Sequence, residues 1–534
     1  MKIIDFQPGA YRNLPPRAIH FTRQVETAPQ EENGCSIRFL VGKNGTGKTN
    51  ILRFLASIFL AIEEDYRHPR PNSPAYTVPY RLVYELHGTR VEINSTGQGR
   101  NGVTFTINGK PENPGDIPSR DQVLPANVLV YTSGDYRDWQ SLFRPGDLES
   151  DEEQADADWN ALRREEELPP YQAGSSGQPG LAETDSLPSD ITPSDETTAI
   201  EDAPSSSSNS FSFKITMPPG FLSGNRRVNL ASASHLKFAL LTALLDHQFH
   251  NRETSALIDA LAEVNLRLLA FSLQLHIDGT VPPYREQLNP LFHLASRTIQ
   301  QWENQLWVYD LSEIDIQSGD SKLQVLAEKQ PPFNFYQMLC NLQERGVLVN
   351  ANLVIEYTPD KRTGQPKRVL LTDDLSDGEF AFISRMALIY LLNEKECLFL
   401  LDEPEVHFND DWKRNLVDSI ERALTQPEKT DSEVILTTHA SIVLTDAFSD
   451  EVILMTYSGQ QIPPRTLGGE PGELLQSVLG ASQTVGKRAI RIIQKALETK
   501  DRATLEAMLK QVGPGLYRFT IIEELQDVSP PEKD

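Results

Sequence analysis

The stretch GKNGTGKT at Gly42–Thr49 constrains the fold of this 534-residue chain more than any other feature. It follows the apolar run SIRFLV and precedes the run NILRFLASIFLAI, whose spacing predicts a helix. A glycine-rich loop in this position matches the phosphate-binding pattern G-x-x-x-x-G-K-[ST] in the context that the pattern requires. Because strands and helices also alternate near both ends of the chain, we expect an α/β nucleotide-binding core.

The loop suggests specific contacts to a nucleotide. Its backbone N–H groups and the start of the following helix suit phosphate oxygens. Lys48 is expected to contact the terminal phosphates, and the Thr49 hydroxyl is expected to bind Mg²⁺. The predicted ATP-binding residues are Gly42, Lys43, Asn44, Gly45, Thr46, Gly47, Lys48, Thr49 and Asn50.

Acidic residues follow a second apolar run. Leu398–Leu401 predicts a buried strand, and Asp402 and Glu403 come directly after it, where open α/β sheets bind ligands. We expect Asp402 to hold Mg²⁺ and Glu403 to orient and deprotonate the attacking water. His439 ends a further strand-like run and is expected to point toward the γ-phosphate. An isolated Asp-Glu pair is often a cap or a solvated turn, and a lone histidine is usually structural, but the complete phosphate loop favours catalytic roles for Glu403 and His439.

A third motif, LSDGE at Leu375–Glu379, opens a helix-like run. Ser376 and the N–H groups around Gly378 suit an anion at a helix start. Ser376 and Glu379 also fit a capping box, in which each side chain satisfies the other residue's backbone N–H. The two interpretations are compatible because both use the same free N–H groups.

In order, GKNGTGKT, LSDGE, LFLLDEPE and TTHAS resemble the motifs of ABC-type ATPases, and most closely those of the RecF/SMC-like branch of AAA family ATPases. There the signature often reads LSxGE and faces the ATP bound by a second copy of the chain. The resemblance therefore implies ATP, Mg²⁺ and a nucleotide-sandwich homodimer or higher homo-oligomer. The residues implied to act in trans are Leu375, Ser376, Asp377, Gly378 and Glu379.

The run DEPEVHFNDDWKRNLV makes the chain look like the compact ATPases of bacterial antiphage and restriction-linked systems, such as the Septu ATPase. The resemblance covers roughly residues 1–146 and 346–460. A basic residue often follows the first strand in this family, and Arg12 matches it. Gln140 is a candidate for the family's glutamine-loop residue.

The motifs lie in two distant halves of the sequence. Between them, Asp147–Asp202 holds 17 Asp or Glu residues against two Arg, so about −15 of the net charge of −25 lies in this stretch. It is too poor in aliphatic residues to offset the entropy of ordering its backbone. We expect five regions: 1–146, the N-terminal half of the core with an antiparallel meander; 147–210, a disordered acidic tether; 211–345, a mixed, mainly helical insert; 346–460, the C-terminal half of the core; and 461–534, a helical tail.

Other sequence features exclude several classes. Cys35, Cys340 and Cys397 are far apart, so neither a disulfide framework nor a zinc site is expected. No apolar run reaches membrane-span length and no secretory signal is evident, so we expect a cytoplasmic protein without a membrane partner. The negative charge disfavours general polyanion binding, although DKRTGQPKR and KRAIRIIQK leave DNA possible as a partner.

Overcoming-lysogenisation-defect relatives carry a nuclease domain after the ATPase core, which needs clustered carboxylates to hold metals. The tail of this chain offers no such cluster, so no built-in nuclease is expected. The leading hypothesis is an ATPase that controls a separate effector, a nuclease, in antiphage or restriction-linked defence. The alternatives are a DNA-repair clamp that binds DNA directly, a transporter cassette, and a non-enzymatic protein in which ATP is structural.

Overall fold

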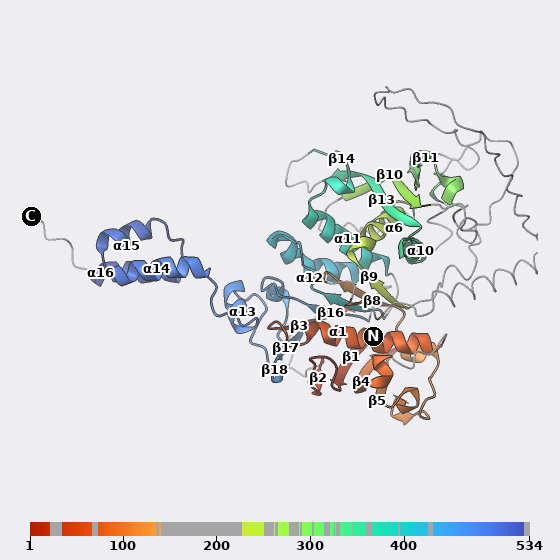
Figure 1. The fold of residues 1–534 in the computed structure, drawn as a ribbon, viewed down its shortest axis with the longest axis horizontal. Coiled ribbons are helices and arrows are strands. Elements are labelled where there is room, and N and C mark those ends of the chain that lie inside the picture. Colours follow the sequence, from red (N-terminus) through yellow and green to blue (C-terminus); the bar gives the residue numbers. More distant parts are fainter. Residues whose placement is uncertain are drawn as a thin grey trace, which may run out of the picture.

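Figure 1 shows the computed structural model of the chain. Gln140 and the whole of the acidic tether predicted at 147–210 lie outside the described residues. The structure describes residues 1–21, 35–66, 73–134, 138–139, 142, 227–249, 261, 265–276, 288, 291–301, 304–313, 321–324, 326, 332–344, 346–358, 366–392, 396–424 and 431–527.

A seven-stranded sheet forms the core and confirms the predicted α/β fold class. Its strands pair in parallel except for the last hairpin, β17–β18. The central strands are almost wholly buried, as expected for a parallel sheet covered on both faces. In spatial order the strands are β18 (Gly459–Gln461), β17 (Val452–Thr456), β3 (Cys35–Gly42), β16 (Ser432–Thr437), β15 (Leu398–Asp402), β8 (Val128–Thr132) and β9 (Val228–Ala231).

The two faces of this sheet contribute to two different hydrophobic clusters. Alternate residues of a strand point to opposite faces, so Leu398 and Leu400 belong to one cluster while Phe399 and Leu401 belong to the other. The first cluster contains the apolar residues of α1 (Lys48–Asp65). The second includes those of α6 (Leu236–Phe249), α10 (Pro332–Glu344), α11 (Asp377–Leu391) and α12 (Asp410–Leu424).

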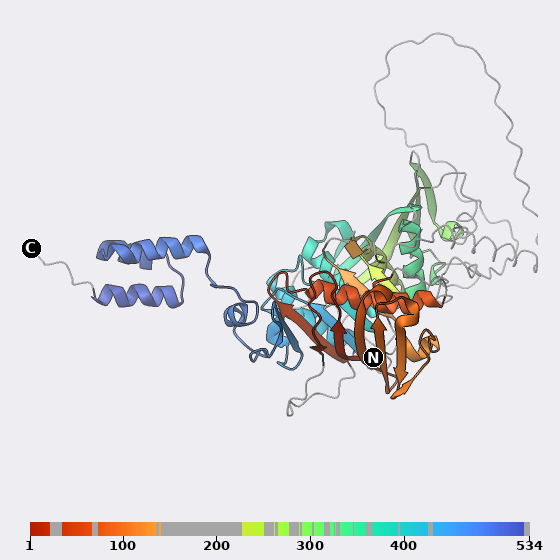
Figure 2. The same ribbon diagram turned by 60° about the horizontal axis from the view of Figure 1, so that its bottom comes forward.

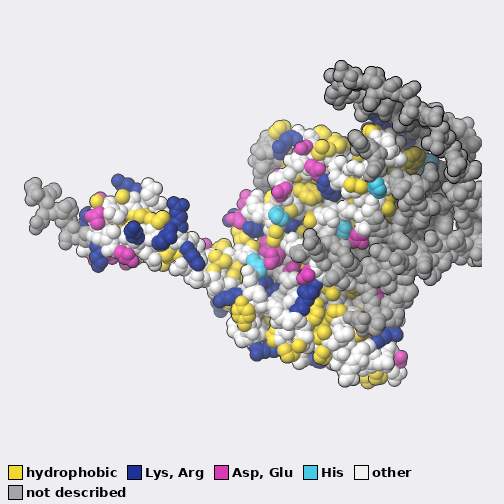
Figure 3. All heavy atoms as spheres, viewed as in Figure 1, with side chains coloured by type: hydrophobic (Ala, Val, Ile, Leu, Met, Phe, Trp, Pro, Cys, Tyr) yellow, Lys and Arg dark blue, Asp and Glu magenta, His cyan; other side chains and the backbone are white. Residues whose placement is uncertain are grey.

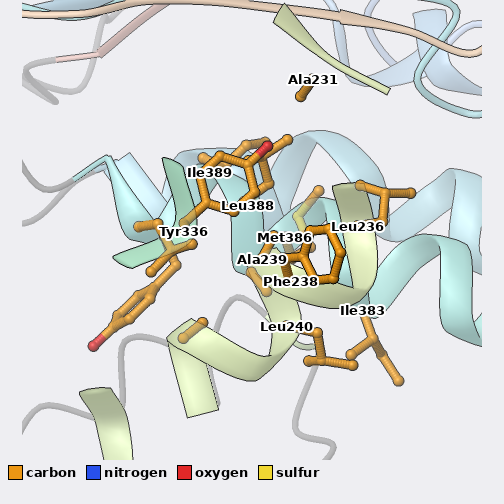
Figure 4. Close-up of a cluster of buried hydrophobic side chains, with 14 of the residues drawn as sticks. Ala231, Leu236, Phe238, Ala239, Leu240, Tyr336, Ile383, Met386, Leu388 and Ile389 are labelled. Carbon is orange, nitrogen blue, oxygen red and sulfur yellow. The ribbon is translucent and has the colours of Figure 1, made fainter. Parts of the chain in front are cut away.

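Helix α6 joins the insert to the core. It packs against α11 and α10 (Pro332–Glu344). Figure 4 shows Leu236 and Phe238 of α6 gathered with Met386 and Ile389 of α11. This apolar packing fixes the helix that follows the LSDGE motif against the insert.

A second sheet, entirely antiparallel, contains the meander of the N-terminal half and lies on the α1 side of the core. Two short helices, α2 (Pro74–Thr77) and α3 (Arg120–Val123), accompany it. The strands in order are β2 (Ile19–His20), β1 (Lys2–Pro8), β4 (Pro79–Leu86), β5 (Thr89–Thr96), β6 (Val103–Ile107) and β7 (Lys110–Pro111).

The third sheet joins strands from both sides of the boundary that was expected between residues 345 and 346. Strands β13 and β14, expected in the C-terminal half of the core from residue 346, pair with strands of the insert, whereas β9, expected in the insert, pairs with β8 of the core. Strand and helix share the described part of the insert, which was expected to be mainly helical. The strands in order are β11 (Arg297–Gln301), β12 (Asn304–Asp310), β10 (Asn265–His276), β13 (Leu348–Thr358) and β14 (Arg368–Leu371).

Helices follow the last strand of the core. The last three of them have a small hydrophobic core of their own, centred on Ile493, Leu505 and Ile521. Figures 1 and 2 show that they stand apart from the body of the molecule. No helix within the described part of the chain is long and apolar enough to cross a membrane. The four helices are α13 (Pro471–Ser477), α14 (Lys487–Thr499), α15 (Arg502–Leu509) and α16 (Leu516–Asp527).

Candidate nucleotide-binding site

The glycine-rich loop connects β3 to α1 and leaves the start of α1 open. The N-cap residue of this helix is Gly47, which has no side chain to cap it, and the first turn contains no acidic residue. The first N–H groups of a helix have no partner within the helix and carry its positive partial charge. The start of α1 therefore offers free donors to an anion.

At two positions of the loop, the neighbouring atoms leave no room for a side chain, so both positions require glycine. Gly42 has φ 145°, and a Cβ on it would lie 2.1 Å from the carbonyl oxygen of Met455. Gly47 has φ 94°, and a Cβ on it would lie 2.4 Å from a methyl group of Leu14. The loop shape thus excludes side chains at both positions, independently of any ligand.

Lys48 is folded back over the loop. Its Nζ donates hydrogen bonds to the carbonyl oxygens of Gly42 (2.9 Å) and Lys43 (3.3 Å), and the residue is only 6% exposed. Burial lowers the pKa of Lys48, while Glu403 and Asp402 act in the opposite direction. The amine is therefore held at the inner side of the loop, close to two carboxylates.

Asp402 lies at the carboxyl end of β15 and accepts two hydroxyl hydrogen bonds on the same oxygen. Thr49 donates to its Oδ1 from the loop side (2.9 Å), and Thr437 donates from the end of β16 (2.8 Å). Burial is the main cause that raises the pKa of Asp402, and these two hydrogen bonds oppose it. Three segments distant in the sequence thus meet at one carboxylate.

Glu403 follows Asp402 in a strained conformation. Its φ is 50°, which is rare for a residue with a side chain, and its N–H donates to the hydroxyl of Thr437 (2.9 Å). This turn brings its Oε1 to 3.3 Å from Nε2 of His439. Burial lowers the pKa of His439, and Lys48 adds to the effect, so the imidazole is neutral near pH 7.

Glu405 holds the backbone of His439 in place. Its Oε1 accepts a hydrogen bond from the hydroxyl of Thr438 (2.6 Å) and one from the backbone N–H of His439 (3.1 Å). The residue is buried, and burial raises the pKa of its carboxyl group. Thr437 and Glu405 have positioning contacts that the sequence analysis missed, although both lie within the motifs TTHAS and LFLLDEPE.

The outer side of the loop is held by residues from both ends of the chain. Asn13 donates to the carbonyl oxygen of Gly45 (2.9 Å) and accepts from Asn50 (2.5 Å). Tyr457, in the turn between β17 and β18, donates its hydroxyl to the carbonyl oxygen of Asn44 (2.8 Å). Neither Asn13 nor Tyr457 was identified from the sequence.

Two further predicted residues make contacts near the loop. The hydroxyl of Thr46 donates to the carbonyl oxygen of Lys43 (2.9 Å), which stabilises the turn. Arg12 lies 3.4 Å from the carboxylate of Asp138, which also pairs with Arg53 of α1 (2.8 Å). Arg12 is therefore tied to α1 through a shared acid.

The LSDGE motif lies at the start of α11. Ser376 caps the helix: its Oγ accepts from the N–H of Glu379 (3.3 Å), and its own N–H donates to Glu379 Oε2 (3.1 Å), so the capping box is formed. Gly378 approaches the segment after β15 closely, because a Cβ on it would lie 2.9 Å from the carbonyl oxygen of His407. The preceding Leu375 and the first helical residue, Asp377, complete the motif.

Arg385 connects α11 to the segment that follows Glu403. Its guanidinium is buried between the rings of Tyr131 and Phe408, and donates to Tyr131 Oη (2.7 Å) and to the carbonyl oxygens of Val406 (2.8 Å) and Pro404. An arginine inside the apolar run FAFISRMALIYLL was the sequence signal for this contact, and it was overlooked.

The structure therefore brings together Lys48, Thr49, Asp402, Glu403 and His439. In the described residues, the hydrogen bonds of Ser376 and Glu379 stay within α11 and its neighbour Tyr357. The same part of the chain contains no group of three or more His, Cys, Asp or Glu side chains arranged to hold a metal ion. The Thr49 hydroxyl and the Asp402 carboxylate still fit Mg²⁺, which is usually held by one or two carboxylates together with substrate phosphates and water.

Residues 37–445 match a family model described as "AAA domain, putative AbiEii toxin, Type IV TA system". The chain belongs to this AAA family. No curated protein matches the sequence. The match runs from β3 to the residues after His439, so this AAA domain includes the loop, LSDGE, Asp402 and Glu403.

Solved structures similar to this AAA protein include two SMC heads. The SMC head bound to the C-winged helix domain of ScpA has 12% sequence identity and a TM-score of 0.33, over 85% of this chain and 93% of that one. The SMC head domain from Thermotoga maritima has 14% identity and a TM-score of 0.30, over 87% of this chain and 99% of that one.

Proposed function

We propose that this AAA protein binds and hydrolyses ATP in a dimer that closes over the nucleotide, and that it controls a separate effector. The observation that carries the ATPase proposal is the convergence of the open start of α1 with Asp402 and Glu403. Thr49 joins the two parts through its hydrogen bond to Asp402. Family membership supports the same activity.

Each residue has a distinct task in this proposal. The free N–H groups at the start of α1 and the amine of Lys48 bind the phosphates. Thr49 and Asp402 would hold Mg²⁺, which supplies positive charge that stabilises the phosphates in the transition state. Glu403 accepts a proton from the attacking water at its carboxylate, and neutral His439, 3.3 Å away, fixes the position of that carboxylate.

The dimer is inferred from the position of the LSDGE motif. Its serine is exposed at the start of a helix, a position that suits an anion, yet the hydrogen bonds of Ser376 within the described chain are local. A second copy of the chain could present this helix start to the phosphates held by the first. Each nucleotide would then contact two subunits, so hydrolysis would require association.

A test of the ATPase proposal uses two variants at different steps. Lys48→Ala is expected to abolish nucleotide binding, measured by the fluorescence of a labelled ATP analogue. Glu403→Gln is expected to keep that binding while turnover falls by about 10²- to 10⁴-fold, the usual contribution of a general base. Wild-type turnover in Glu403→Gln would contradict the assignment of the base.

A test of the dimer compares two changes at one position. Ser376→Ala removes the cap, which costs about 1 kcal/mol, but leaves the helix start accessible. Ser376→Arg removes the cap too, and its long side chain blocks access to the helix start. We expect ATP to increase the mass measured by light scattering for Glu403→Gln and for Glu403→Gln with Ser376→Ala, but not with Ser376→Arg. An equal mass increase in all three would rule out closure at this helix.

The effector is inferred from two observations. The family description names a toxin of a toxin–antitoxin system, which supports a partner protein. The described residues after His439 hold no cluster of carboxylates for a second catalytic site. Co-expression with the protein encoded beside this chain tests the idea. We expect DNA cleavage by that pair to change with ATP for the wild type but not for Lys48→Ala, and unchanged cleavage would contradict it.

A further inference from the structure

Helix α14 carries a group of cations that the proposed ATPase cycle does not use. Lys487, Arg488, Arg491 and Lys495 are all exposed, and none forms an ion pair with a residue that the structure describes. No acidic residue lies among them from Gly486 to Leu497. Within a chain of net charge −25, this is a local concentration of four unpaired positive charges.

The four cations lie on one side of the helix. Lys487, Arg491 and Lys495 are spaced by four residues, and Arg488 is adjacent to this row, so neighbours lie about 5–6 Å apart on the helix surface. The row spans about 12 Å along the axis, given a rise of 1.5 Å per residue. Such a regular row of charges, without a pocket, suits a polymer with regularly spaced phosphates.

The opposite side of α14 is already occupied. Ile490, Ile493 and Ala496 are buried, and α14 packs there against α15 and α16. An amphipathic helix binds a bilayer by inserting its apolar side among the lipids. Because Ile490, Ile493 and Ala496 pack in the core of the helical module formed by α14, α15 and α16, Ile492 is the one large apolar side chain of α14 that is exposed. The other exposed large apolar side chains of these helices, Leu516, Phe519 and Ile522, lie on α16 rather than beside the cations of α14.

The module is placed so that a large partner can reach it. Figure 2 shows α14, α15 and α16 standing off from the sheets, joined to them through α13. Lys and Arg side chains gather on its surface in Figure 3. The row of cations on α14 therefore lies on a part of the molecule that stands off from the body.

We propose that α14 binds the phosphate backbone of duplex DNA through Lys487, Arg488, Arg491 and Lys495. The contact is electrostatic and independent of base sequence, because it uses cations alone. The site is separate from the nucleotide-binding loop, so this proposal does not depend on ATP hydrolysis.

The test measures binding of a fluorescent 30-base-pair DNA to the full chain by anisotropy, without nucleotide, at several salt concentrations. One variant replaces all four cations with Gln, which favours helix and so preserves α14. A matched control replaces four ion-paired cations with Gln and changes the net charge equally. The control positions are Arg81, Lys322, Arg414 and Arg422.

Each phosphate contact contributes about 0.9 to the log–log salt slope, so we expect the α14 variant to lose about 3–4 units of slope and at least about tenfold in affinity at low salt. The control variant should bind nearly as the wild type does. A charge-preserving variant, with Lys and Arg exchanged at the four positions, should also keep its affinity, and circular dichroism should show unchanged helix in all three.

Four results would overturn the proposal. They are an equal loss in the ion-paired control, an unchanged slope in the α14 variant, a loss as large in the charge-preserving variant, and preferential binding of wild type to anionic lipid vesicles over DNA. Lys48→Ala should bind DNA as the wild type does, which separates a failure of this proposal from a failure of the ATPase proposal.

Discussion

Buried carboxylates lie at both ends of the parallel strands, and their partners differ. At the carboxyl end, Asp402 accepts from two hydroxyl groups and is placed beside the phosphate loop. At the opposite end, Glu433 of β16 is fully buried and accepts a hydrogen bond from the backbone N–H of Ile3 (2.6 Å). Burial raises the pKa of Glu433 to about 7, although Arg38, Lys2 and the amino terminus oppose it.

The raised pKa of Glu433 predicts a loss of stability as pH rises. Between its unfolded value of 4.5 and about 7, the folded protein binds more protons than the unfolded chain, so the free energy of unfolding falls with rising pH. A shift of this size corresponds to roughly 3 kcal/mol at most. We expect Glu433→Gln to melt at a higher temperature than the wild type at pH 8 and at a similar temperature at pH 5.

Differential scanning fluorimetry across this pH range provides the measurement. The control is Glu473→Gln on the exposed side of α13, which should keep the wild-type pH profile. If Glu433→Gln melts below the wild type at pH 8, the charged carboxylate stabilises the fold and the sign of the argument is wrong.

For single residues, the sequence predicted which side chains share one edge of the sheet. The glycine loop, Asp402, Glu403 and His439 follow strands or precede a helix, and parallel strands end together. It did not predict Thr437 or Asn13, because a threonine after a strand and an asparagine in a loop carry no pattern of their own. Their importance lies in contacts between distant segments.

Among the elements, α11 links the LSDGE motif to the segment that follows β15. Its first turn is capped by Ser376, and two turns later Arg385 holds the carbonyl oxygens of Pro404 and Val406, which follow Glu403. Arg385 therefore connects the helix that begins after Ser376 to the segment that follows Glu403.

Arg385→Met tests this connection. Methionine replaces the aliphatic part of the side chain, but it leaves the space of the guanidinium empty and leaves buried acceptors without donors, at a cost of about 1–3 kcal/mol each. We expect ATP turnover to fall on the order of 10- to 100-fold because Glu403 is displaced. Nucleotide affinity should change little, because the phosphate loop is untouched, and the labelled ATP analogue would measure it.

A matched control for this variant is Arg422→Met on α12, whose exposed guanidinium pairs with Asp418 of the same helix. It should leave turnover unchanged. Equal losses of nucleotide affinity and turnover in Arg385→Met would instead indicate a general collapse of the site.

Element prediction failed where a pattern fits two structures. Residues 265–271 lie in the insert, which was expected to be mixed and mainly helical, yet they belong to β10, whose buried residues Leu266, Leu268, Phe271, Leu273 and Leu275 pack in one cluster with α6 and α10. Short apolar runs satisfy helical and strand spacing equally. Strand β9 was missed because four residues carry too little pattern, and its place is set by pairing with β8.

For the whole molecule, the last segments of the chain meet the first motif. The turn after α13 lies against the phosphate loop, because a Cβ on Gly480 would be 2.0 Å from Cε of Lys43. Gly480 has φ 70°, which disfavours any side chain. The connection between α13 and α14 therefore packs on Lys43, a residue of the candidate nucleotide site. No local sequence pattern could reveal this contact.

This contact predicts that Gly480→Ala weakens nucleotide binding, whereas Gly486→Ala does not. Both are single methyl additions in the same connection, but nothing lies within 4 Å of a Cβ on Gly486, where φ is −63°. At Gly480 the left-handed backbone lowers stability by about 1–2 kcal/mol in the free and the bound protein alike, so it does not change affinity by itself. The side chain of Lys43 must also move away from its place beside the loop, and for this reason we expect the Kd of the labelled ATP analogue to rise about 2- to 3-fold. Equal affinities in the two variants would show that the connection between α13 and α14 does not influence nucleotide binding at the loop.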